Sequence, residues 1–114
     1  MTQGQMLTEY RSRLNGLLSI SMHQKTVLAV GCGAGSYMLE KLARSAPAVI
    51  RLVDFDTVEW PNLARTAFGA SDVGSTKVAA LSRHIKDACP LVEVEGHCRD
   101  ICAMPEGEVA ALMD

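Results

Sequence analysis

Three glycines and a serine stand close together after a short apolar run, in the order Gly31-Cys-Gly33-Ala-Gly35-Ser36. Glycine lets a backbone turn sharply and approach a ligand closely, and a helix that begins directly after such a loop offers free N–H groups to an anion. The spacing is G-x-G-x-G, and Ser36 stands where the longer G-x-G-x-x-G pattern has its third glycine. The segment predicts either a nucleotide-binding loop or a tight strand-to-helix turn, and its position between a strand and a helix favours the nucleotide.

Two acidic residues follow the next apolar run. Asp54 comes directly after residues 49–53, and Asp56 follows two positions later. A carboxylate at the end of the second strand of a nucleotide-binding unit can accept hydrogen bonds from ribose hydroxyls. Asp54 could instead be a solvated cap. Asp56 could face a metal ion or cap the following turn, and the sequence leaves both roles open.

Three possible phosphate ligands lie farther along the chain. Asn62 and Arg65 are three residues apart and can fall on one side of a helical turn, and arginine offers paired donors to phosphate. Lys77 opens a predicted helix, where a positive charge opposes the helix dipole, so another reason for it such as a phosphate ligand is indicated. Each of the three could also be an ordinary solvated side chain.

Alternating strands and helices must position these residues. We predict buried strands at 26–30, 49–53 and 91–94 and helices at 36–45, 77–88 and 105–113, with a long connection over 55–72. Such alternation predicts an α/β fold with a Rossmann-like parallel sheet flanked by helices. Ligands bind at the carboxyl ends of the strands in such sheets, and both Gly31 and Asp54 stand at such ends.

The N-terminal residues and the composition set the domain organisation. Residues 6–22 carry apolar side chains at partly helical spacing, so we expect a helical arm over 1–24 and the nucleotide-binding domain over 25–114. The chain has 114 residues, 48% of them hydrophobic, and a formal net charge of -2 without a basic block. This predicts one domain, and nucleic acid is not an implied partner.

No apolar run reaches the length of a membrane span, and no secretion signal opens the chain, so we expect a cytoplasmic protein without a membrane partner. Cys98 and Cys102 lack the second pair that a zinc site requires, and we predict no metal ligands among the residues of this chain. Cys32 and Cys89 are expected to be small, reduced core residues.

The segments Asp54-Phe-Asp56-Thr-Val-Glu-Trp-Pro-Asn62-Leu-Ala-Arg65 and Asp72-Val-Gly74-Ser-Thr-Lys77-Val together resemble the ThiF-type adenylating family. This family has the fold of ubiquitin-activating enzymes and of bacterial activators of sulfur carriers. The likeness covers roughly residues 26–102. Its most specific part is the segment from the aspartates to the arginine.

The resemblance implies an enzyme that uses ATP to adenylate the C-terminal carboxylate of a ubiquitin-like or sulfur-carrier protein or peptide, with release of pyrophosphate. It implies a homodimer or heterodimer, in which an arginine of the arm, Arg11 or Arg13, reaches the partner's phosphates. Arg65 and Lys77 would be catalytic, because they would neutralise charge as pyrophosphate departs. The nucleotide-binding residues carried over from the family are Gly31, Gly33, Gly35, Asp54, Asp56, Asn62, Arg65 and Lys77.

Two departures from the family pattern matter. The glycine loop is one residue shorter than usual. The resemblance also places a magnesium-binding aspartate after a further strand, beyond residue 114. We therefore expect Mg²⁺ to accompany ATP, and we expect this chain to be the N-terminal part of a longer protein. Its sheet would be incomplete at the C-terminus, and the part alone would bind nucleotide poorly and be inactive.

Other readings stay open at this point. Residues 27–35 also resemble motif I of S-adenosylmethionine-dependent methyltransferases, whose glycine spacing they fit better. Against that reading, Ala29 stands where those enzymes carry an acidic residue, and neither they nor NAD-binding dehydrogenases need the three phosphate ligands. A third alternative is a non-catalytic scaffold member of the ThiF-type family.

Overall fold

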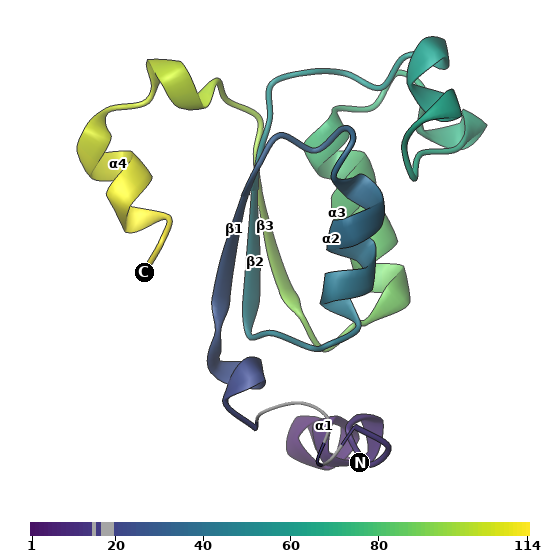
Figure 1. Ribbon diagram of the computed structural model, residues 1–114, viewed down its shortest axis with the longest axis vertical. Coiled ribbons are helices and arrows are strands. Elements are labelled where there is room, and N and C mark those ends of the chain that lie inside the picture. The colour runs from purple at the N-terminus through teal and green to yellow at the C-terminus, as the bar shows by residue number, and fades with distance from the viewer. Residues whose placement is uncertain (15, 17–19) are drawn as a thin grey trace.

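The computed structural model describes residues 1–14, 16 and 20–114. Three parallel strands form a sheet in the order β1-β2-β3, with bounds Thr26–Val30, Val49–Val53 and Glu93–His97 (Figure 1). Its register pairs Val27 with Ile50 and Ile50 with Val94. The predicted α/β class with a Rossmann-like parallel sheet is confirmed, and the bounds of the first two strands are as expected.

Two helices, α2 (Ser36–Ala43) and α3 (Lys77–Ala88), cover one face of the sheet (Figure 1). Successive side chains of a strand point to opposite faces, so Ile50 and Leu52 face these helices and are fully buried. The main core lies in this layer and includes the two cysteines predicted to be internal. Its buried members are Cys32, Leu39, Ala43, Ala46, Ile50, Leu52, Val58, Phe68, Val78, Ala80, Leu81, Ile85, Cys89 and Val92.

The third strand was predicted at 91–94, which is wrong by about two residues. Val92 belongs to the turn after α3, where its N–H donates to the carbonyl of Cys89 and its own carbonyl accepts from the Lys86 ammonium. Its apolar side chain is buried under that turn and not in the strand ladder. The strand itself runs through Gly96, where a Cβ would lie 3.3 Å from Cβ of Val78, so this glycine lets α3 pack closely.

The opposite face of the sheet carries α4 (Glu106–Ala111), a shorter helix than the predicted 105–113 (Figure 1). Val53 packs there with Met104 and Leu112 in a small second core. Arg51 also points to this face, where its guanidinium donates to the carbonyl of Leu112 at 2.9 Å and pairs with Glu95. The end of α4 is therefore held by a side chain from the middle of β2.

The expected helical arm over residues 1–24 is not one continuous helix. Helix α1 covers Gln3–Tyr10, and a short 3-10 helix follows at Ile20–Gln24. Gly16 has φ +86, which an α-helix cannot accommodate, and the predicted apolar residues 17 and 18 lie outside the described residues. The Tyr10 hydroxyl donates to the carbonyl of Arg44 at 2.8 Å and ties α1 to the end of α2. None of the helices in the described part of the chain is long and apolar enough to cross a membrane.

Candidate nucleotide-binding site

The glycine loop joins β1 to α2 at the carboxyl end of the sheet. Gly31 has φ +85, a left-handed conformation that favours glycine, and its N–H donates to the carbonyl of Val53 at 2.8 Å. The chain then turns so that the N–H of Ser36 donates to the carbonyl of Gly33 at 3.0 Å. Gly35 is the N-cap of α2 and has no side chain to cap it. The N–H groups of Tyr37 and Met38, in the first turn of α2, therefore remain available to an anion.

Asp54 links this loop to the end of β2. Its carboxylate accepts hydrogen bonds from the N–H of Cys32 at 2.7 Å and from the N–H of Asp56 at 2.8 Å. The residue is only 9% exposed. Each carboxylate oxygen thus already holds one backbone group, and the remaining lone pairs are what a ribose hydroxyl could use.

Lys77 reaches this loop from α3. Thr76 caps that helix, because its hydroxyl accepts from the N–H of Ala79 at 3.2 Å. The ammonium of Lys77 lies 3.6 Å from Oδ2 of Asp56, and a Cβ at Gly33 would lie 3.6 Å from the same nitrogen. A cation, the glycine loop and an acidic pair therefore meet at one edge of the sheet, although Lys77 stands 44 positions after Gly33.

Asn62 and Arg65 lie on the connection between β2 and α3. The segment Trp60–Ala64 forms a 3-10 helix that Arg65 terminates, and Oδ1 of Asn62 accepts from the N–H of Glu59 at 2.8 Å. The guanidinium of Arg65 is exposed and has no side-chain partner among the described residues. Within the described contacts, neither side chain touches the glycine loop. The structure therefore brings Lys77 to the loop and leaves Asn62 and Arg65 on a separate segment.

Two structural features of the site were not predicted from the sequence. Ser36 is fully buried, and its hydroxyl oxygen accepts from the N–H of Ala67 at 2.9 Å, which ties the glycine loop to the connection. The position of Ser36 directly after the three glycines is the sequence feature that could have indicated this role. A pocket of about 160 Å³ also opens at this edge. Its lining residues are Val30, Gly31, Val53, Asp54, Phe55, Asp56, Arg99, Asp100 and Ile101. The last three went unnoticed because β3 ends later than predicted.

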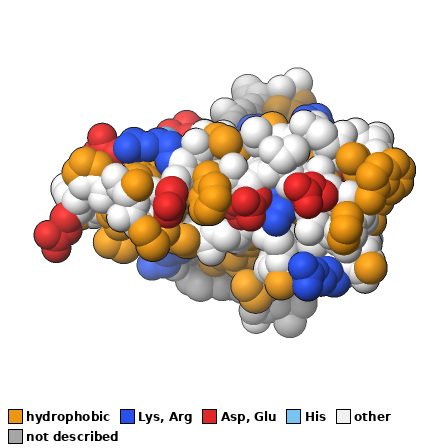
Figure 2. All heavy atoms as spheres, turned by 90° about the horizontal axis from the view of Figure 1, so that it is seen from above, with side chains coloured by type: hydrophobic (Ala, Val, Ile, Leu, Met, Phe, Trp, Pro, Cys, Tyr) orange, Lys and Arg blue, Asp and Glu red, His pale blue; other side chains and the backbone are white. Residues whose placement is uncertain are grey.

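Charges gather at this edge of the molecule. Seen from above, Figure 2 shows a basic side chain between acidic ones near the middle of the surface. Below the surface, burial and the nearby charge of Asp54 raise the pKa of the Cys32 thiol to about 12, although the ammonium of Lys77 acts in the opposite direction. Cys32 is therefore a neutral core group under the loop and is not a nucleophile.

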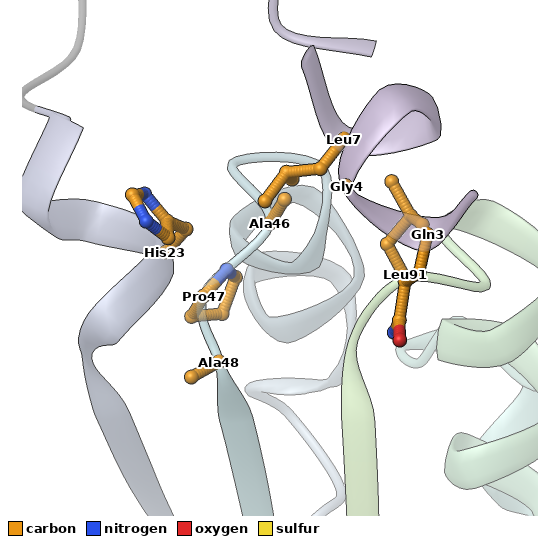
Figure 3. A pocket seen from close by; sticks show the side chains of 8 residues that line it. All are labelled: Gln3, Gly4, Leu7, His23, Ala46, Pro47, Ala48 and Leu91. Atoms are coloured by element: carbon orange, nitrogen blue, oxygen red, sulfur yellow. The ribbon is translucent and has the colours of Figure 1, made fainter. Parts of the chain in front are cut away.

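A second pocket, of about 370 Å³, lies near the amino ends of the strands, where the arm meets the domain (Figure 3). Leu7 of α1 lies over Ala46, and His23 faces them from the other side. Arg11, one of the two arm arginines, is buried, and its guanidinium lies 2.7 Å from Nδ1 of His23. Arg13 is exposed. None of the predicted nucleotide-binding residues lines this pocket.

The combination of glycine loop, acidic strand end and helix-borne lysine can be compared with known proteins. The model of the ThiF family matches residues 14–113. The chain belongs to the ThiF family. This membership replaces the methyltransferase and dehydrogenase interpretations of the glycine loop.

Several ThiF-like proteins are similar to this chain. The tRNA threonylcarbamoyladenosine dehydratase 2 of Saccharomyces cerevisiae is 39% identical over 71 residues, which are 60% of this chain and 16% of that protein. The ubiquitin-like modifier-activating enzyme 5 of Drosophila willistoni is 35% identical over 77 residues, which are 67% of this chain and 19% of that enzyme. The chain thus spans less than a fifth of the length of these two relatives.

Solved structures of E. coli MccB also resemble this chain. MccB with ATP superposes with a TM-score of 0.71 at 26% identity, covering 87% of this chain and 31% of MccB. MccB with AMPCPP and the selenomethionine form of MccA superposes with a TM-score of 0.68 at 29% identity, covering 71% of this chain and 25% of MccB. These ThiF-type structures share the Rossmann-like fold of this chain.

Proposed function

We propose that this chain is the ATP-binding part of a ThiF-type enzyme that adenylates the C-terminal carboxylate of a ubiquitin-like or sulfur-carrier protein or peptide. The observation that carries the proposal is the position of Lys77, whose ammonium lies 3.6 Å from Oδ2 of Asp56 and 3.6 Å from a Cβ position on Gly33. A cation over a glycine loop suits a polyphosphate, because phosphates bind to backbone N–H groups and positive charge together. The ATP complex of MccB supports the choice of nucleotide.

The proposed reaction is a nucleotidyl transfer. A carboxylate oxygen of the substrate attacks the α-phosphorus of ATP, a new O–P bond forms, and the bond to the bridging oxygen of the β-phosphate breaks. Pyrophosphate leaves with the bonding electron pair, and an acyl-adenylate remains. Positioned positive charge stabilises the leaving pyrophosphate, since charge accumulates on its oxygens in the transition state.

Each site residue has a place in this scheme. Gly31, Gly33 and Gly35 let the loop approach the nucleotide, and Asp54 holds the ribose from the pocket wall. Asp56 orients the ammonium of Lys77 through their ion pair. Lys77 then neutralises phosphate charge beside the loop.

Asn62 and Arg65 contribute from the connection. The Arg65 guanidinium is exposed and without a side-chain partner in the described part of the chain, so its donors are free to pair with phosphate oxygens. The Asn62 amide nitrogen is available, because its oxygen already holds the N–H of Glu59. Arg65 and Lys77 therefore share the catalytic role of offsetting the charge on pyrophosphate.

A magnesium site is not formed by the acidic residues that the structure describes. No three His, Cys, Asp or Glu side chains of the described residues lie together as a metal site. Asp56 has an exposed side chain at the nucleotide edge, but it faces Lys77, and Asp100 is another exposed acidic residue in the lining of the same pocket. Mg²⁺ is proposed to accompany ATP, and no step of the proposed reaction depends on it.

The partner is proposed from the relatives. MccB has been solved with MccA, and another relative is named a ubiquitin-like modifier-activating enzyme. Both support a peptide or a ubiquitin-like protein as the substrate that brings the carboxylate. A homodimeric or heterodimeric assembly is proposed with it.

Pyrophosphate exchange tests this function. The full-length protein that contains residues 1–114 should exchange labelled pyrophosphate into ATP when its carboxylate partner is present. Arg65→Ala should lower the exchange by roughly 10-fold to 150-fold, because a lost hydrogen bond to a charged group costs about 1.5–3 kcal/mol. Arg44→Ala is the matched control, since Arg44 is an exposed arginine at the far end of α2. Unchanged exchange in Arg65→Ala would remove Arg65 from the mechanism.

The shorter glycine loop favours a second candidate function, that of a non-catalytic scaffold subunit in a ThiF-type heterodimer. The same preparation separates the two. Exchange with a carboxylate partner supports the enzyme, whereas stable association with an active ThiF-type subunit and no exchange by this protein alone supports the scaffold.

A further inference from the structure

The geometry points to His84 as a positioning residue that fixes, through Asp72, the connection carrying Asn62 and Arg65. This inference rests on the proposed role of that connection in binding the phosphates of ATP. His84 lies on α3, seven residues after Lys77, and neither the sequence pattern nor the family resemblance pointed to it.

His84 contacts the connection at two places. Its Nε2 lies 2.8 Å from Oδ2 of Asp72, and its ring stands edge-on to Phe68 with 6.1 Å between the ring centroids. On its other side, Nδ1 lies 3.9 Å from Oε2 of Glu40 on α2. One side chain thus joins both ends of the segment 68–72 to the two helices under it.

Asp72 links His84 to the backbone of the connection, because its carboxylate contacts both. Its carboxylate also accepts from the N–H of Gly69 at 2.9 Å and from the Arg83 guanidinium at 3.2 Å. Asp72 is only 5% exposed, so a lost donor would not be fully replaced by water. The turn at 69–72 therefore depends on the side chains that face this carboxylate.

The segment next to Arg65 is held by hydrogen bonds that continue from this turn. The N–H of Phe68 donates to the hydroxyl oxygen of Thr66 at 3.3 Å, and that hydroxyl donates to the carbonyl of Asn62 at 2.8 Å. The N–H of Ala67 donates to Ser36 at the glycine loop. Arg65 stands inside this bonded segment, so the segment sets where the backbone of Arg65 lies.

Two variants separate the hydrogen bond of His84 from its bulk. His84→Leu keeps an apolar contact with Phe68 but removes the donor to Asp72. His84→Gln keeps an N–H donor at a similar reach and should restore the contact. Asp87→Asn is the matched control on the same helix, because Asp87 is exposed and makes no side-chain hydrogen bond or ion pair with the other described residues.

Two measurements on the full-length protein test the inference. Hydrogen exchange without nucleotide should be faster at the amides of Ala67 and Gly69 in His84→Leu than in the wild type, and unchanged in His84→Gln and Asp87→Asn. Calorimetric titration with ATP and Mg²⁺ should show about tenfold weaker binding for His84→Leu alone, the size of effect that a weakened hydrogen bond to a charged group produces.

The outcomes are distinct. Faster exchange with weaker ATP binding, both restored by glutamine, supports the inference. Faster exchange with unchanged ATP affinity overturns the positioning role and leaves the proposed function standing. If the wild type binds no ATP, the proposed function fails, and the exchange data alone still decide whether His84 fixes the connection.

Discussion

The N–H of Cys32 donates to the carboxylate of Asp54 at 2.7 Å, so the residue that ends β2 also holds the glycine loop that follows β1. The second carboxylate oxygen holds the N–H of Asp56. Asp54 therefore stabilises the glycine loop and the end of β2 whether or not a nucleotide ribose is bound. A loss of activity in an Asp54 variant reports on nucleotide contact only after its effect on stability has been measured.

Asp54→Asn should lower the free energy of unfolding by about 1–3 kcal/mol, because the amide has only one oxygen and its NH₂ group would face a backbone N–H. Urea denaturation followed by circular dichroism measures the change. Asp56→Asn is the control, since its exposed carboxylate lies 3.6 Å from Lys77 and contributes at most about 1 kcal/mol. Equal stability of Asp54→Asn and the wild type would contradict this stabilising role.

Gly96→Ala should destabilise the protein by about 1–3 kcal/mol, the usual cost of overpacking. The added Cβ would lie 3.3 Å from Cβ of Val78 and 3.5 Å from Oγ of Ser82, so α3 would have to move away from β3. Thermal or urea unfolding gives the value. Gly107→Ala is the opposite control, because its Cβ meets open space inside α4 and alanine gains up to about 1 kcal/mol in a helix. If both substitutions stabilise, α3 does not pack closely on β3.

The contribution of Asp72 to stability should depend on acid pH. Burial acts to raise the pKa of Asp72, but hydrogen bonds from the Gly69 N–H, His84 and Arg83 outweigh it and lower the pKa from its usual 3.8. A carboxyl whose pKa is lower in the folded state stabilises the protein above the unfolded pKa, and this stability is lost as pH falls through the folded pKa.

Asp72→Asn should therefore be less stable than the wild type at pH 7, by about 1–3 kcal/mol, and the difference should shrink as pH falls below about 4. Urea titrations of both proteins at a series of pH values measure it. Asp87→Asn serves as the reference for loss of one carboxyl on the neighbouring surface. A difference that is constant across the acid range would show that the pKa of Asp72 is not lowered by folding.

The four cysteines should divide into two reactive and two protected thiols. Cys98 and Cys102 are exposed, whereas Cys32 and Cys89 are fully buried, and the pKa of Cys32 is raised to about 12. A thiol-reactive chromogenic disulfide at neutral pH should label two thiols per native chain at once and four after denaturation. The double variant Cys98→Ser and Cys102→Ser should show no rapid labelling. Rapid labelling of that variant would place Cys32 or Cys89 within reach of solvent.

The sequence by itself determined the local elements and the residue types of the site. The bounds of β1, β2 and α3 are as predicted, because short apolar runs, a proline after the helix and helical spacing of Val78, Leu81 and Ile85 are local signals. Local signals failed at β3, where the buried Val92 packs under a turn and Glu93–His97 forms the ladder with β2. Burial in a turn and burial in a strand give the same apolar pattern.

Only the tertiary structure decided which residues meet. The Lys77 ammonium lies beside Gly33, the Asp54 carboxylate holds Cys32, and His84 contacts Asp72, although none of these pairs is adjacent in the sequence. Parallel strands bring successive carboxyl ends to one edge, which is why the sequence could place Gly31 and Asp54 at the same edge. The contacts of Lys77 and His84 depend on how α3 packs and on which rotamers these side chains adopt. Neither the packing nor the rotamers produce a pattern that can be recognised in a single sequence.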